Sequence, residues 1–105
     1  MTDLKIARLT GVSRGFGGDN AYYTGPDGEE IVVAVSWALL NQYHTWVSHY
    51  RADSKAMNHF YDNRYVEPDE ALRRSGYEPD VHIDFCDPDS WLPYELLSRA
   101  PDQQP

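Results

Sequence analysis

The feature that most constrains the fold is a tight turn between two runs of β-forming residues. The turn Gly25-Pro26-Asp27-Gly28 combines a proline, which presets φ, with a glycine that accepts positive φ. Residues 21–24 precede the turn and residues 30–35 follow it, and the second run is nearly continuous in apolar residues. The sequence therefore predicts a β-hairpin whose second arm is a buried central strand.

The segment that follows the hairpin shows helical spacing. Ser36 resembles an N-cap, and apolar or aromatic residues such as Tyr43, Val47 and Tyr50 recur every three or four positions. We expect a helix over residues 37–60, or two helices with a break near residues 51–53, where Asp53 would cap the second. Its apolar stripe should pack on the hairpin.

The remaining elements are shorter. We expect a first strand over residues 4–9, a glycine-rich loop over residues 10–20, and a short helix over residues 68–74 that begins at Pro68 and ends before Gly76. A half-buried strand over residues 81–86, a turn over residues 87–90 and a last helix over residues 92–99 follow. The predicted fold class is α+β, a small mostly antiparallel sheet (N-terminal strand, hairpin, late strand) covered by one long or broken helix, plus short helices. Residues 1–100 would form a single domain, and residues 101–105 a flexible tail.

Composition excludes several classes of protein. With Cys86 as the only cysteine among 105 residues, neither an internal disulfide nor a cysteine-rich zinc site can form. The first residues lack the apolar core of a signal peptide, and the longest apolar run, residues 31–35, is far too short to span a bilayer. We therefore expect a cytoplasmic protein, in the host cell's cytoplasm if a phage encodes it.

The charge is the most unusual bulk property. The formal net charge is −8, and residues 61–105 carry most of it, with eleven acidic and four basic residues. Such a field repels nucleic acid and anionic membranes, so we expect direct binding to neither. It favours a larger basic protein as partner, such as a nucleic-acid-binding complex, although a solvated acidic face that only aids solubility explains it equally well.

Signals for chemistry are weak. The run Gly15-Phe16-Gly17-Gly18 lacks the third glycine of a dinucleotide fingerprint and the lysine of a P-loop. His82, Asp84 and Cys86 share one face of the predicted strand, but two or three candidate ligands at this common spacing do not define a metal site. We expect no cofactor, no metal and no enzyme activity, with Cys86 an inert thiol; a small metal-dependent enzyme centred on His82 and Asp84 is the alternative.

The aromatic content points to contacts with other molecules. Eight tyrosines and three tryptophans exceed what so small a core needs, and such rings are favoured anchors in protein interfaces. Whether the rings of the predicted helix belong to core or interface stays open, and a structural subunit that assembles as a homodimer or larger homo-oligomer is a second hypothesis. The preferred hypothesis is a small acidic protein-binding module, similar in size and charge pattern to phage-encoded inhibitors of host defence, including anti-CRISPR proteins, that occlude a basic partner by carboxylate mimicry of nucleic acid. The residues proposed for partner binding are Asp62, Tyr65, Glu67, Asp69, Glu70, Tyr77, Glu78, Asp80, Asp84, Asp87, Asp89 and Trp91.

Overall fold

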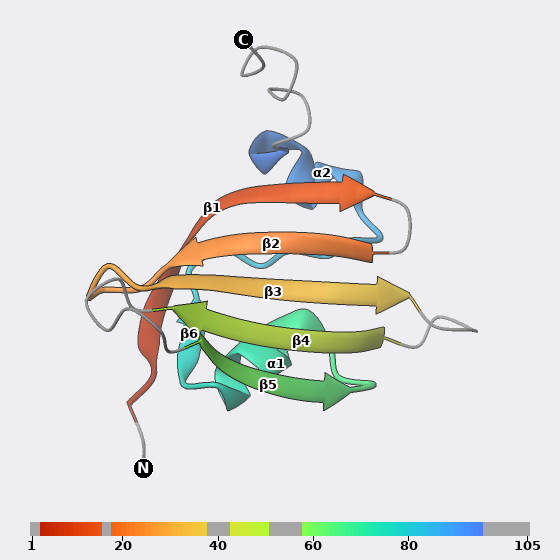
Figure 1. The fold of residues 1–105 in the computed structure, drawn as a ribbon. Coiled ribbons are helices and arrows are strands. Elements are labelled where there is room, and N and C mark those ends of the chain that lie inside the picture. Colours follow the sequence, from red (N-terminus) through yellow and green to blue (C-terminus); the bar gives the residue numbers. More distant parts are fainter. Residues whose placement is uncertain (1–2, 16–17, 38–42, 51–57, 96–105) are drawn as a thin grey trace, which may run out of the picture.

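The fold is a six-stranded sheet that curls into a half-barrel (Figure 1). The computed structural model describes residues 3–15, 18–37, 43–50 and 58–95. The strands are β1 (Lys5–Gly15), β2 (Gly18–Thr24), β3 (Glu30–Trp37), β4 (Tyr43–Tyr50), β5 (Asn58–Arg64) and β6 (Tyr77–Pro79), in the order β5-β4-β3-β2-β1-β6. Neighbours from β5 to β1 pair antiparallel, whereas β6 pairs parallel with β1, so the sheet is mixed.

The predicted hairpin is confirmed. β2 and β3 pair antiparallel in the register Tyr23↔Ile31, and Gly28 at the turn has a φ of 83°. Ile31, Val33 and Val35 of β3 are buried, with neighbouring strands on both sides of β3. The second arm is therefore a central strand, as its apolar composition indicates.

The predicted long helix over residues 37–60 is wrong. Its described parts form the strands β4 and β5, so no long helix covers the sheet and the predicted architecture is corrected to a strand-rich half-barrel. Thr45 and Val47 are buried on one face of β4, and Val47 lies opposite Val33 of β3. Aromatic and β-branched residues suit this position, because they pack well on the pleated surface of a sheet. The predicted break near residues 51–53 lies outside the described residues.

Two further expectations about strands are corrected. Most of the predicted loop over residues 10–20 belongs to β1 and β2, which pair from Arg8↔Thr24 to Gly15↔Gly18 with an irregularity between Leu9 and Gly11. Residues 81–86 do not join the sheet; the late strand is β6, a few residues earlier. Buried and outward-facing residues still alternate in this segment, although it is not a strand: Ile83 and Phe85 are buried, and His82 is exposed.

The short helices are partly as predicted. α1 (Pro68–Arg74) has the expected bounds, with Pro68 in its first turn and Gly76 at a φ of 102° just beyond its end. The predicted turn over residues 87–90 is instead the start of α2 (Pro88–Trp91), capped by the side chain of Asp87. Of the predicted last helix, only a 3₁₀ turn, η3 (Leu92–Tyr94), is described. Residues 96–105, with the predicted tail, lie outside the described part.

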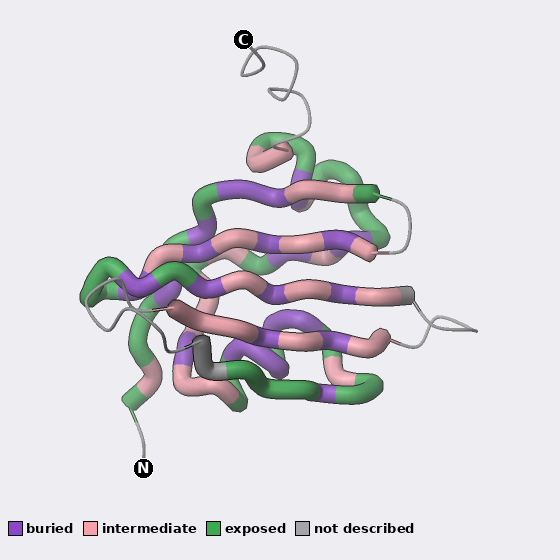
Figure 2. The backbone as a smooth tube through the Cα atoms, viewed as in Figure 1, coloured by how far each residue is buried: buried purple, intermediate pink, exposed green. Residues whose placement is uncertain are grey.

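The sheet has one covered and one open face. Buried and half-buried residues alternate along β2, β3 and β4 (Figure 2). The buried residues face α1 and the segment 80–87, and Ala71 and Leu72 of α1 join Val33 and Val47 in one core cluster. In the described part of the chain, no helix is long and apolar enough to cross a membrane. The core therefore lies on one side of the sheet, and the elements that cover it carry most of the acidic residues.

Candidate functional site

The most distinctive chemical feature is the covering layer, residues 67–95, which we call the acidic layer. It comprises α1, β6, the segment 80–87, α2 and η3. It contains nine acidic residues against two arginines, Arg73 and Arg74. The acidic residues are Glu67, Asp69, Glu70, Glu78, Asp80, Asp84, Asp87, Asp89 and Glu95.

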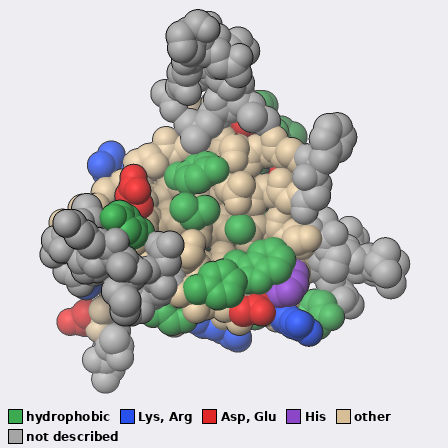
Figure 3. Space-filling model, in the orientation of Figure 1, with side chains coloured by type: hydrophobic (Ala, Val, Ile, Leu, Met, Phe, Trp, Pro, Cys, Tyr) green, Lys and Arg blue, Asp and Glu red, His purple; other side chains and the backbone are tan. Residues whose placement is uncertain are grey.

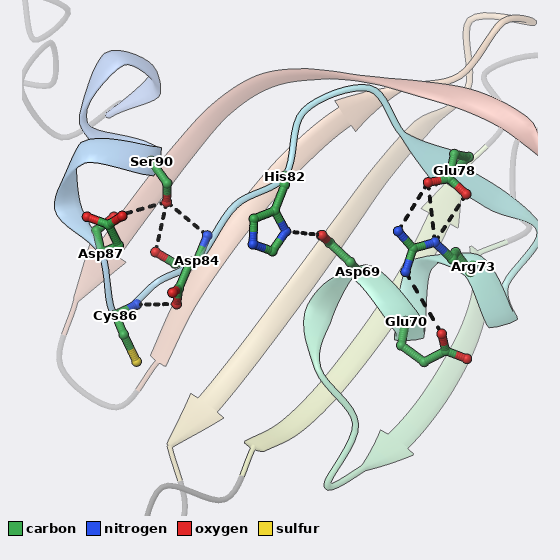
Figure 4. Close-up of polar contacts among 9 residues, drawn as sticks. All are labelled: Asp69, Glu70, Arg73, Glu78, His82, Asp84, Cys86, Asp87 and Ser90. Atoms are coloured by element: carbon green, nitrogen blue, oxygen red, sulfur yellow. Dashed lines mark hydrogen bonds and ion pairs between the residues drawn. The ribbon is translucent and has the colours of Figure 1, made fainter.

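Both arginines form ion pairs with glutamates of the acidic layer. Arg73 donates from Nε to Glu78 Oε1 at 3.1 Å and from a terminal nitrogen to Glu78 Oε2 at 3.2 Å (Figure 4). This hydrogen-bonded pairing raises the pKa of Arg73 further above its usual range. The Nε of Arg74 lies 3.5 Å from Glu70 Oε2, one helical turn away. The arginines therefore tie α1 to β6 and to itself, and most of the negative charge remains uncompensated.

Three aspartate side chains accept hydrogen bonds from backbone N–H groups. Asp80 Oδ1 accepts the backbone N–H of Leu9 at 3.0 Å, which docks the layer on β1. Asp84 Oδ1 accepts the N–H of Cys86 at 2.9 Å. Asp87 Oδ1 accepts the N–H of Asp89 at 3.1 Å and so caps α2. These bonds hold the backbone of the segment 80–89 and place its carboxylates at defined positions.

Inside the layer, Asp69 and His82 form a contact between α1 and the segment 80–87. His82 Nδ1 hydrogen-bonds Asp69 Oδ2 (Figure 4), and this bond raises the pKa of His82 above its ordinary value. The Asp69 side chain is only 10 % exposed, whereas that of His82 is 72 % exposed. Asp69 Oδ1 is buried and has no hydrogen-bond partner among the described residues. Asp69 is thus a largely buried carboxylate whose hydrogen-bond partner is an exposed imidazole.

This pair borders a cavity of about 250 Å³. Ile83 and Phe85 form its apolar wall, and the polar groups that line it come from Tyr43, Glu67, Asp69, His82, Asp84 and Cys86. The hydroxyl of Tyr43 lies 4.0 Å from the sulfur of Cys86. Partial burial, followed by this contact, raises the pKa of Tyr43 to about 12, so its hydroxyl is protonated at neutral pH.

Among the described residues that line the cavity, no nucleophile hydrogen-bonds the imidazole of His82. A carboxylate–histidine pair orients a general base in many enzymes, but a nucleophile must then lie within hydrogen-bond reach of the imidazole. Figure 4 shows the Cys86 sulfur pointing away from the His82 ring. Nor do three or more histidine, cysteine, aspartate or glutamate side chains of the described residues converge as a metal site would require.

The other residues proposed for partner binding lie in different surroundings. Tyr77 and Trp91 are buried, and the indole nitrogen of Trp91 donates to the Phe85 carbonyl at 3.2 Å. Tyr65 is 65 % exposed with a φ of 59°, just after β5. Asp62 lies on the open face, where its Oδ1 is 2.8 Å from His44 Nε2. The structure therefore gathers the carboxylates of residues 67–89 and separates Asp62 from them.

Two buried carboxylates escaped sequence reasoning. Glu29, only 2 % exposed, accepts the Tyr77 hydroxyl at 2.8 Å and the N–H of Asp27 at 2.9 Å. Burial alone would raise the pKa of Glu29, but hydrogen bonds from the backbone and from Tyr77 outweigh it and lower the pKa. Asp19, 3 % exposed, pairs with Arg14, whose guanidinium lies 4.3 Å from the Trp91 ring centre. The only sequence signal for Glu29 is its position directly after the glycine that ends the predicted turn.

Comparison of the chain with protein-family models, with curated proteins and with solved structures gives no match.

Proposed function

We propose that the chain is a small protein-binding module that holds a basic surface of a larger partner against its acidic layer. The observation that carries this proposal is the arrangement of the layer itself. Nine acidic residues against two arginines stand on the helices α1 and α2, the strand β6 and the hydrogen-bonded segment 80–87, and not on an unstructured tail. Carboxylates at fixed positions lose little conformational freedom on binding, which favours a specific contact.

The exposed carboxylates are available for such a contact. Glu67 and Asp89 are exposed, and neither side chain hydrogen-bonds another of the described residues. A lysine or arginine of the partner would pair with them without breaking a bond inside the layer. If the partner's basic surface is a nucleic-acid-binding groove, the module would compete with the nucleic acid, because both present rows of negative charge.

The test distinguishes binding at the acidic layer from attraction by the net charge of the whole chain. The double variant Glu67→Gln/Asp89→Asn removes two charges from the layer, and Asp3→Asn/Glu30→Gln removes two exposed charges outside it. Binding to a fluorescent lysine-rich peptide is measured by anisotropy at low and at physiological salt. We expect the layer variant to weaken binding by about 2- to 30-fold more than the control, since two exposed charge pairs at about 0.2–1 kcal/mol each are lost. Equal losses in both variants would show that only the overall field attracts the peptide.

A further inference from the structure

The face of the sheet opposite the acidic layer carries a group of apolar and aromatic side chains. In the register of the strands, Tyr22 lies opposite Val32, Ala34 opposite Trp46, and Ser48 opposite Phe60. These residues alternate with the buried ones, so they point away from α1 and the core. We call them, with the other outward-pointing residues of β1 to β5, the open face. Figure 3 shows hydrophobic side chains gathered across it, with none of the described elements lying over them.

This pattern departs from the usual antiparallel sheet. When one face packs on the core and the other meets water, the outward positions are normally polar. Here the outward positions of the central strands β3 and β4 include Val32, Ala34 and Trp46, and on β5 Phe60 is 62 % exposed. Large apolar side chains grouped on the outward face of a sheet mark a candidate surface for contact with another molecule.

Among the described residues, the charges of the open face balance. Arg8 and Arg64 point to this side, as do Glu30 and Asp62, and Asp62 pairs with His44. The acidic layer, on the other side of the sheet, has nine acidic residues and two arginines. The open face is therefore a large surface over which this strongly acidic chain is electrically neutral.

From this asymmetry we propose that the open face is the contact between two copies of the chain, which pack sheet against sheet. A chain of net charge −8 repels its own copy unless the approaching surfaces are neutral. In the face-to-face arrangement both acidic layers point outward, separated by two sheets and both cores. Because packed sheets alone lie about 10 Å apart, that separation exceeds the Debye length of about 8 Å at physiological ionic strength.

The size of the open face sets the strength of the contact. Strands lie about 4.8 Å apart and rise about 3.3 Å per residue, so β2 to β5 present an area of roughly 20 by 25 Å. That area, about 500 Å², is below the ~800 Å² that each partner contributes to a standard interface. We therefore expect a reversible dimer whose population depends on concentration. The inference does not rest on the proposed function, because it involves the opposite side of the sheet.

The experiment measures self-association by sedimentation velocity across a wide dilution series. Phe60→Lys on the open face is matched by Leu92→Lys on η3, where Leu92 is 53 % exposed and an apolar side chain likewise becomes a lysine. We expect a concentration-dependent dimer for the native chain and for Leu92→Lys. We expect Phe60→Lys to raise the dissociation constant by at least about 10-fold, because two lysines are desolvated in each dimer.

A second variant is needed because Phe60 lies on β5, the edge strand of the sheet. Val32→Lys places the charge at the centre of the face, and we expect it to weaken the dimer more than Phe60→Lys does. Circular dichroism checks that each variant keeps the native strand content; if Val32→Lys unfolds, the comparison of Phe60→Lys with Leu92→Lys decides alone. A monomer at every concentration would overturn the proposal, as would a dimer that Phe60→Lys leaves intact or that Leu92→Lys weakens equally.

Discussion

The buried carboxylate of Glu29 supports a prediction that can be worked out from its contacts. Glu29 is 2 % exposed, and the Tyr77 hydroxyl donates to its Oε2 at 2.8 Å. The bond joins the β2–β3 turn to β6, which are far apart in the sequence. Tyr77→Phe removes this donor and leaves the ring in place. A hydrogen bond to a charged group is worth about 1.5–3 kcal/mol, so we expect the free energy of unfolding at neutral pH to fall by about that amount.

The control is Tyr22→Phe. Tyr22 is half-buried, and its hydroxyl hydrogen-bonds the neutral hydroxyl of Ser13 at 3.1 Å. Its loss should cost only about 0.5–1.5 kcal/mol, as for an ordinary neutral pair. Both variants are compared with the native chain by urea denaturation, followed through tryptophan fluorescence. If the two variants lose the same free energy of unfolding at neutral pH, the Tyr77 hydroxyl does not donate to a charged Glu29, and the reasoning is refuted.

The pH dependence of stability gives a second test of the bond between Glu29 and Tyr77. The pKa of Glu29 is lower in the folded chain than its ordinary value of 4.5. A depressed pKa means that the carboxylate contributes stability above its unfolded pKa, and that this contribution is lost as pH falls through the folded pKa. The cost of Tyr77→Phe should therefore shrink toward that of a neutral hydrogen bond once Glu29 is protonated. A cost that does not change between neutral and acidic pH would contradict the assignment.

Two further predictions concern the acidic layer and the hairpin turn. The pKa of His82 is raised by its bond to Asp69, so the stability from this pair is complete below the ordinary pKa of 6.5 and is lost as pH rises through the folded value. We expect thermal melts to show this decline in the native chain and a flatter profile in His82→Gln, with a difference below about 1 kcal/mol because His82 is largely exposed. In Gly25→Ala the new Cβ would lie 2.4 Å from Cδ of Glu29, so we expect a loss of about 1–3 kcal/mol in urea denaturation. Gly15→Ala is the control, because its Cβ meets no atom of the described residues closer than 4.0 Å; equal losses would argue against a clash at Gly25.

The elements that sequence reasoning identified correctly are those with local signals. The β2–β3 turn follows from Gly25-Pro26-Asp27-Gly28, and α1 begins at Pro68 and ends before Gly76, as proline and glycine indicate. Such signals depend on the backbone preferences of a few adjacent residues, and tertiary contacts do not override them here.

The wrong helix has an identifiable cause on β4. Apolar residues occupy both faces of this strand: Val47 points to the core, and Trp46 points to the open face. Period-two alternation disappears when both faces are apolar, and what remains fits the spacing of a helix. Thr45 is the residue that distinguishes the two, because it is fully buried in the strand but lies off the stripe of the predicted helix. The open face and the misassigned helix are therefore two consequences of one sequence pattern.

The partners within the site could not be predicted, because they are set by long-range packing. Asp69 meets His82 only because α1 and the segment 80–87 lie side by side on the sheet. The short parallel strand β6 pairs with β1 across most of the chain, and a three-residue strand has no periodicity to detect. The concentration of acidic residues was visible in the sequence, whereas their assembly on one side of the sheet required the topology.

The acidic layer and the open face should respond to salt in opposite directions. Binding of a basic partner to the acidic layer is Coulombic, so added salt screens the attraction and weakens it. Self-association through the open face brings together two chains of net charge −8, so salt screens their repulsion while apolar burial continues to stabilise the dimer. Raising the ionic strength should therefore release the lysine-rich peptide and increase the dimer fraction of the same sample. A dimer that dissociates in salt would mean that charged groups hold the two copies together, and the open face, with its balanced charges, would then not be their contact.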